Sequence, residues 1–119
     1  MEKMTVTRGH GFTGSTAILR VTGPLTLATA FVLQDELGAI GDVDTVIDVS
    51  ASPYMDSAGL GAILSHWTHT QRSGRKFALT GVTPRVALLL EITKADMVLP
   101  IFATAEEADR AFAPKAATA

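Results

Sequence analysis

Segments with the apolar pattern of β-strands alternate with segments of helical periodicity, and this alternation constrains the fold more than any other feature of the sequence. Two strand-like segments come first, and helix and strand patterns then take turns, which gives the order β-β-α-β-α-β-α-β-α. Such an order is typical of parallel strands joined through helices. We therefore predict an α/β fold: a mixed, mainly parallel sheet with helices packed on it and a hairpin at its start.

The individual elements follow from local signals. Apolar spacing by three and four predicts a first helix from Leu27, Ala30, Phe31, Leu33, Leu37 and Ile40, and a later helix with the buried stripe Val86, Leu89, Leu90 and Ile92. Thr83-Pro84 marks the start of that later helix, and Thr104 opens a last short helix with the spacing of a capping box. The predicted strands are 5–7, 16–21, 46–49, 76–82 and 98–102.

The most apolar strand is Val46-Ile47-Asp48-Val49, a nearly continuous run typical of a strand covered on both faces. Asp48 interrupts the run, and we expect it to bond to backbone N–H groups near the strand end. In parallel sheets, ligands and partners meet the loops at the carboxyl ends of the strands. The loop that follows Val49 is therefore the first place to look for a site.

Length and composition narrow the function classes. The 119 residues suffice for one domain, which we expect to span 1–113 and to be followed by a flexible tail, 114–119. A net charge of −2 argues against direct nucleic-acid binding, and the absence of cysteine removes thiolate metal sites. No apolar run approaches the roughly 20 residues of a membrane helix. We expect a cytoplasmic protein with no membrane insertion and no cofactor.

The loop after Val49 runs into a helix that is predicted to extend to about Ser73, and either Asp56 or Ser57 can cap it. Gly59 and Gly61 fall in its first turns, where each glycine costs about 1 kcal/mol relative to alanine. Glycines at such positions allow another backbone or a phosphate to come close.

Two large side chains, Tyr54 and Met55, precede the cap. Large apolar groups in loops often contact partner proteins. We predict that both belong to a partner surface, with packing onto the domain's own core as the alternative.

Catalysis by Ser57 needs a base within hydrogen-bond reach. His66 and His69 lie nine and twelve residues further along the same helix, about 13–18 Å away along its axis. His10 lies in a turn and is not excluded by sequence alone. His66 and His69 lack further ligands at metal-binding spacing, so we expect no metal site and a solvated face on either side of a core Trp67.

Five segments resemble the STAS domain, and in particular the bacterial anti-sigma factor antagonists: Val46–Ser50, Asp56–Gly61, Gly74–Leu79, Thr83–Val86 and Pro100–Ala108. The resemblance extends from about Val6 to Phe112, and the Asp-Ser-x-Gly-Leu-Gly block is its most specific part. It implies that Ser57 is phosphorylated by an anti-sigma factor serine kinase, and that Asp56, Gly59 and Gly61 shape the acceptor loop.

The resemblance also implies a cycle of partner switching. The unmodified protein would bind the anti-sigma factor and free a sigma factor for transcription, and a serine phosphatase would reset the modified form. One position departs from the family pattern, which usually reads Gly-x-Leu-Asp after the second strand. Here the sequence is Gly23-Pro24-Leu25-Thr26, so Thr26 stands in the partner surface where an aspartate is usual.

Two other functions remain open from the sequence. A STAS-type accessory or scaffold subunit of a transporter or signalling complex would bind without phosphorylation. A small serine hydrolase or a phosphate-binding enzyme is the more remote alternative, because the sequence offers no evident base and no complete glycine-rich phosphate loop.

Overall fold

The computed structural model describes residues 3–11 and 15–113. This part of the chain forms a five-stranded sheet in the order β1-β2-β3-β4-β5. Its strands are β1 (Thr5–His10), β2 (Thr16–Thr22), β3 (Asp44–Ala51), β4 (Phe77–Thr80) and β5 (Ile101–Phe102). Only β1 runs antiparallel to its neighbour, and the pairs β2–β3, β3–β4 and β4–β5 are parallel. The predicted fold class, including the opening hairpin, is confirmed.

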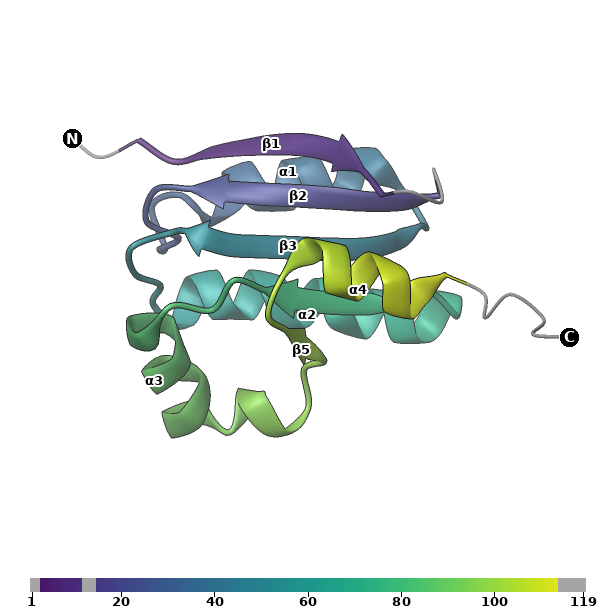
Figure 1. Cartoon of the computed structure of the whole chain (residues 1–119). Coiled ribbons are helices and arrows are strands. Elements are labelled where there is room, and N and C mark those ends of the chain that lie inside the picture. Colours follow the sequence, from purple (N-terminus) through teal and green to yellow (C-terminus); the bar gives the residue numbers. More distant parts are fainter. Residues whose placement is uncertain (1–2, 12–14, 114–119) are drawn as a thin grey trace, which may run out of the picture.

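Helices cover both faces of the sheet. They are α1 (Ala30–Ile40), α2 (Ser57–Ser73), α3 (Pro84–Thr93), the short 3-10 helix η1 (Ala95–Met97) and α4 (Ala105–Phe112). Helices α1 and α2 lie behind the sheet as drawn, and α4 lies in front of it (Figure 1). Apart from η1, the order of elements is the predicted one. The predicted flexible tail, 114–119, lies outside the described residues.

Coverage on two faces explains the apolar run in β3. Ile47 and Val49 belong to the main core beneath α1 and α2, whereas Val46 packs with Ala108 and Phe112 of α4. Alternate residues of a strand point to opposite faces, so a strand between two helical layers needs apolar side chains at nearly every position.

Asp48 is the polar exception in β3, and its carboxylate is buried. Oδ1 accepts hydrogen bonds from the backbone N–H of Ser50 at 2.9 Å and from Ser50 Oγ at 2.6 Å. Oδ2 accepts from Thr80 Oγ1 at 3.3 Å and lies 3.8 Å from the Arg20 guanidinium. The expected bond to a backbone N–H is confirmed, and side chains of both neighbouring strands complete the environment.

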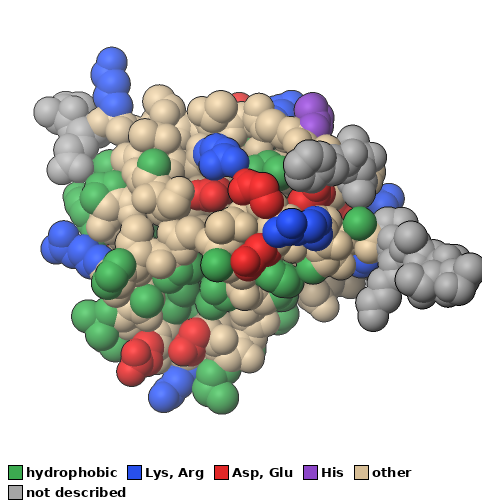
Figure 2. Space-filling view, in the orientation of Figure 1, with side chains coloured by type: hydrophobic (Ala, Val, Ile, Leu, Met, Phe, Trp, Pro, Cys, Tyr) green, Lys and Arg blue, Asp and Glu red, His purple; other side chains and the backbone are tan. Residues whose placement is uncertain are grey.

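One residue of the predicted buried stripe, Ile92, is 69% exposed. Two apolar residues of the first predicted helix are also exposed, Leu27 at 79% and Phe31 at 59%. Helix α1 begins only at Ala30 and buries Ala30, Leu33 and Leu37, so Leu27 precedes it in a turn. Helix α3 buries only Val86 and Leu90, and the lower end of the molecule in Figure 2 shows the hydrophobic side chains that gather over α3 and η1.

Candidate functional site

The loops that follow β2 and β3 lie side by side at the carboxyl ends of these parallel strands. Leu25 and Met55 form an isolated parallel bridge. The N–H of Leu25 donates to the carbonyl of Tyr54, and the N–H of Asp56 donates to the carbonyl of Leu25, both at 3.1 Å. These bonds tie the start of α2 to a loop that is about thirty residues earlier in the chain.

Asp56 joins the two loops through its side chain as well. Oδ1 accepts from the N–H of Gly59 at 2.9 Å, which makes Asp56 the N-cap of α2, and Oδ2 accepts from the N–H of Leu27 at 3.0 Å. The Gly59 N–H is the main cause that lowers the pKa of Asp56; desolvation opposes the shift, and the Leu27 N–H adds to it. Of the two capping residues that the sequence left open, the structure selects Asp56.

Ser57 is the first residue of α2 and is exposed. Among the residues that the structure describes, no side chain or backbone group bonds to its hydroxyl. The side chain of Asp56 holds the N–H groups of Gly59 and Leu27, so the helix start that carries this exposed hydroxyl is fixed to the β2–α1 loop. Such a group is accessible to a second protein.

The two glycines of α2 have different environments. A Cβ on Gly59 would lie 2.2 Å from the carbonyl oxygen of Leu25, so this glycine lets the β2–α1 loop approach the helix. A Cβ on Gly61 would meet nothing within 4 Å. The prediction that a glycine here admits another backbone is confirmed for Gly59, and the backbone belongs to the chain itself.

Thr26 lies in the β2–α1 loop and is half-buried. Its N–H donates to Thr29 Oγ1 at 2.9 Å, and its carbonyl accepts from the N–H of Ala30 at 2.8 Å. The next residue, Leu27, is the one held by Asp56. The residue that departs from the family pattern is therefore part of the same interlocked loop pair as Ser57.

The side chains of Tyr54 and Met55 lie in different environments. Met55 is 8% exposed and belongs to the main core, so its side chain is not available as partner surface in this conformation, and we leave it out of the proposed interface. The reason is the bridge to Leu25, which turns this part of the loop onto the core. Tyr54 is half-buried, and the guanidinium of Arg85 lies 5.4 Å from its ring centroid.

His10 lies at the opposite end of the sheet from Ser57. It pairs with Ala17 at the start of β2, and Ala17 pairs with Thr45 at the start of β3, whereas Ser57 follows the end of β3. Six residues of strand separate Thr45 from Ala51, a distance of roughly 20 Å. The sequence left His10 open as a base for Ser57, and the sheet register places it out of reach.

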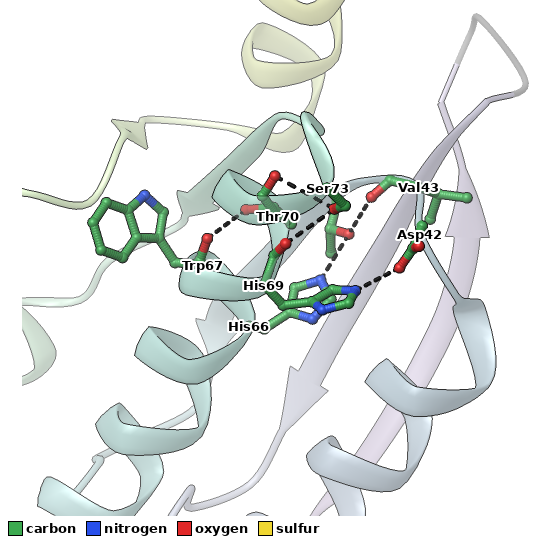
Figure 3. Close-up of polar contacts among 8 residues, drawn as sticks. Asp42, Val43, His66, Trp67, His69, Thr70 and Ser73 are labelled. Carbon is green, nitrogen blue, oxygen red and sulfur yellow. Dashed lines mark hydrogen bonds and ion pairs between the residues drawn. The ribbon is translucent and has the colours of Figure 1, made fainter.

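The other two histidines contact the start of β3 and the loop before it (Figure 3). His66 is buried, and its Nε2 lies 3.0 Å from Thr45 Oγ1, which itself donates to the carbonyl of Val43. His69 is exposed and bonds to Asp42 at 2.5 Å. The predicted solvated face is correct for His69 and wrong for His66, because α2 packs this residue against β3.

The pKa of His66 is lowered to about 4, mainly by burial and then by the charge of His69, while Asp42 partly offsets both effects. The side chain is therefore neutral near pH 7 and serves the packing between α2 and β3. Within residues 3–11 and 15–113, no group of three His, Cys, Asp or Glu side chains has a geometry that could hold a metal ion.

Sequence reasoning gave no role in the site to Leu27, whose N–H bonds to Asp56, or to Arg85, whose guanidinium lies over the ring of Tyr54. Leu27 was assigned to the first helix, although the turn residues before Ala30 could have indicated a later helix start. No local signal points to Arg85, because its contact with Tyr54 joins the segment after β4 to the segment after β3. None of the described helices is long and apolar enough to cross a membrane.

The family model described as the STAS domain matches residues 7–108. An anti-sigma factor antagonist from Mycobacterium paratuberculosis has a similar structure, with a TM-score of 0.83 at 21% identity over 92% of this chain and 94% of that chain. The antagonist SpoIIAA in its unphosphorylated form gives 0.67 at 17% identity, over 90% and 97%. A sulfate transporter family protein from Wolinella succinogenes gives 0.71 at 20% identity, over 82% and 84%.

Proposed function

Because this chain belongs to the STAS domain family, we propose that it is an anti-sigma factor antagonist that switches partners through phosphorylation of Ser57. The unmodified protein binds an anti-sigma factor serine kinase in the cytoplasm, phosphorylation releases that partner, and a serine phosphatase restores binding. The observation that carries the proposal is the exposed Ser57 hydroxyl on the first residue of α2, at a helix start that Asp56 caps and ties to the β2–α1 loop. Structural similarity to antagonists, one of them known in an unphosphorylated form, supports it.

Electrostatics explains how a phosphate would act as a switch. Phosphoserine brings roughly −1.5 to −2 charges. The N–H of Gly59 is already bound by Asp56, so the phosphate gains little from the helix start and remains hydrated beside another anion. A partner that covers Ser57 must remove that hydration, which costs several kcal/mol unless the partner supplies cations.

The proposal is for a protein that acts by binding and not by catalysis. A serine nucleophile needs a base within hydrogen-bond reach. His10 lies at the other end of the sheet, and His66 is bonded to Thr45. Ser57 therefore fits a phosphate acceptor better than a nucleophile.

The direct test is phosphopeptide mapping after incubation with purified anti-sigma kinases from the same organism and ATP. We expect phosphate on Ser57, no incorporation in Ser57→Ala, and normal incorporation in Ser65→Ala, which removes an exposed serine from the same helix. Calorimetric titration should then show a loss of affinity of more than a hundredfold for the phosphorylated form. Phosphate confined to other residues, or equal affinities of both forms, would refute the switch.

Thr26 favours a second candidate, a STAS-type accessory or scaffold subunit that binds without phosphorylation. The fold is shared with a sulfate transporter family protein, and the acid usual at this loop position is absent. This function predicts that the chain co-purifies with its partner while Ser57 stays unmodified and that Ser57→Asp leaves the association intact.

A further inference from the structure

Two large apolar side chains stand in solvent on the segment that Asp56 ties to the start of α2. Leu27 is 79% exposed and Phe31 59%, although neither contributes to the core. They are four residues apart across a turn in which the N–H of Ala30 donates to the carbonyl of Thr26. Residues four apart across such a turn lie on one side of it, so the turn presents both side chains on the same side of this segment.

Asp56 fixes the position of this segment relative to Ser57. One carboxylate oxygen holds the N–H of Leu27, and the other caps the helix on which Ser57 is the first residue. The bridge between Leu25 and Met55 adds a second connection between the same loops. A protein that covers the Ser57 hydroxyl closely therefore meets Leu27 as well.

Charge indicates the chemistry of the occupant. Between Gly23 and Gln71 the chain has no Lys or Arg, and two of its acids flank the pair. Asp56 holds the N–H of Leu27, and the exposed Asp35 follows Phe31 by four residues in α1. Acidic groups beside an apolar pair are repelled by an anionic membrane and by a second copy of the same surface, and they complement a protein with a basic rim.

We propose that Leu27 and Phe31 are the apolar anchors by which this chain docks into an apolar, basic-rimmed pocket of its anti-sigma kinase. The proposal rests on the function proposed above and adds to it the part of the surface that determines affinity. Apolar and aromatic anchors surrounded by weaker contacts carry most of the energy of typical interfaces. The loop that bears Thr26 then recognises its partner mainly through Leu27 rather than through a carboxylate.

The test compares two double variants against the same purified kinase by calorimetric titration. Leu27→Ala with Phe31→Ala removes the anchors, and Leu88→Ala with Ile92→Ala removes side chains of similar exposure from α3, which are 57% and 69% exposed. We expect the anchor variant to bind at least about tenfold more weakly and the α3 variant to bind within about twofold of the parent. Because all four side chains are exposed, both variants should melt close to the parent temperature.

The possible results separate the two proposals. Unchanged affinity of the anchor variant, with a parent that binds and is phosphorylated on Ser57, would overturn the anchor assignment and leave the proposed function standing. Failure of the unmodified parent to bind any of the kinases would refute both. A dimer of the parent that the anchor variant converts to monomer, with kinase affinity unchanged, would identify the pair as a self-association surface and would also overturn the assignment.

Discussion

The first two turns of α2 hold two glycines, and single substitutions should separate their roles. Gly59→Ala would place a methyl group 2.2 Å from the Leu25 carbonyl oxygen, so one of the two backbones must move. We expect a loss of about 1–3 kcal/mol in the free energy of unfolding, measured by urea denaturation. Gly61→Ala meets open space and should stabilise the helix by about 0.5–1 kcal/mol. Equal effects of the two changes would contradict this account.

Asp56 is the other residue whose role a single change can test. Asp56→Ala removes the cap of α2 and should cost about 1 kcal/mol of stability at pH 7. Asp56→Asn keeps a capping oxygen but has no charge. Because the pKa of Asp56 is lowered from 3.8 in the folded state, its ionised form contributes stability above about pH 4, and that contribution is lost as the pH falls through the lowered pKa.

We therefore expect the stability difference between the wild type and Asp56→Asn to be largest above pH 4 and to shrink towards pH 2–3. Urea unfolding of both proteins across this range measures it. A difference that stays constant with pH would show that the carboxylate charge is not what holds Leu27 and Gly59.

At the scale of elements, α2 meets β3 through His66 and Thr45, and this contact makes the packing sensitive to acid. The pKa of His66 falls from 6.5 to about 4 on folding. As the pH is lowered, this histidine is therefore protonated in the unfolded chain before it is protonated in the folded protein. Stability from the neutral side chain is complete above pH 6.5, decreases as the pH falls towards 4 and then levels off. The loss amounts to roughly 3–4 kcal/mol at most, because a pKa difference of one corresponds to about 1.4 kcal/mol.

His66→Gln keeps a hydrogen-bonding side chain but removes the titration. We expect the free energy of unfolding of the wild type to fall more steeply between pH 6.5 and 4 than that of the variant, as followed by urea denaturation. Parallel curves for the two proteins would show that the packing of α2 on β3 does not depend on the protonation of His66.

For the whole molecule, the sheet predicts an uneven distribution of stability. Strands β2 and β3 are paired on both sides, and β3 is covered by helices on both faces. Strand β5 contributes only two residues to the sheet edge, and the neighbouring α3 and η1 expose Ile92 and Met97. Segments with few buried contacts open at lower free energy than the core does.

Native-state hydrogen exchange should therefore show the amides of β2 and β3 exchanging only through global unfolding. The amides of η1 and β5 should exchange through a smaller opening that leaves the contacts of Asp56 with Leu27 and Gly59 intact. Equal protection of β3 and β5 would indicate a single cooperative unit.

Much of the site could be predicted from the chain because its parts are local. Asp56, Ser57 and Gly59 lie within four residues, and capping depends on groups in the first turn of one helix. The contact between Asp56 and Leu27 spans 29 residues, and the approach of Leu25 to Gly59 spans more. No local pattern encodes these contacts, so the second half of the site became visible only when the loops after β2 and β3 were placed side by side.

The sequence by itself determined the order of the elements, the parallel sheet and the limits of α2, because periodicity and capping depend on neighbours along the chain. Tertiary structure decided which side chains are buried. Met55 and His66 lie in the interior, whereas Leu27, Phe31 and Ile92 lie in solvent. A hydrophobic side chain has only a tendency to be buried, because burial requires that another element pack against it. In this protein the packing depends on where α1 begins and on how little of α3 contacts the sheet.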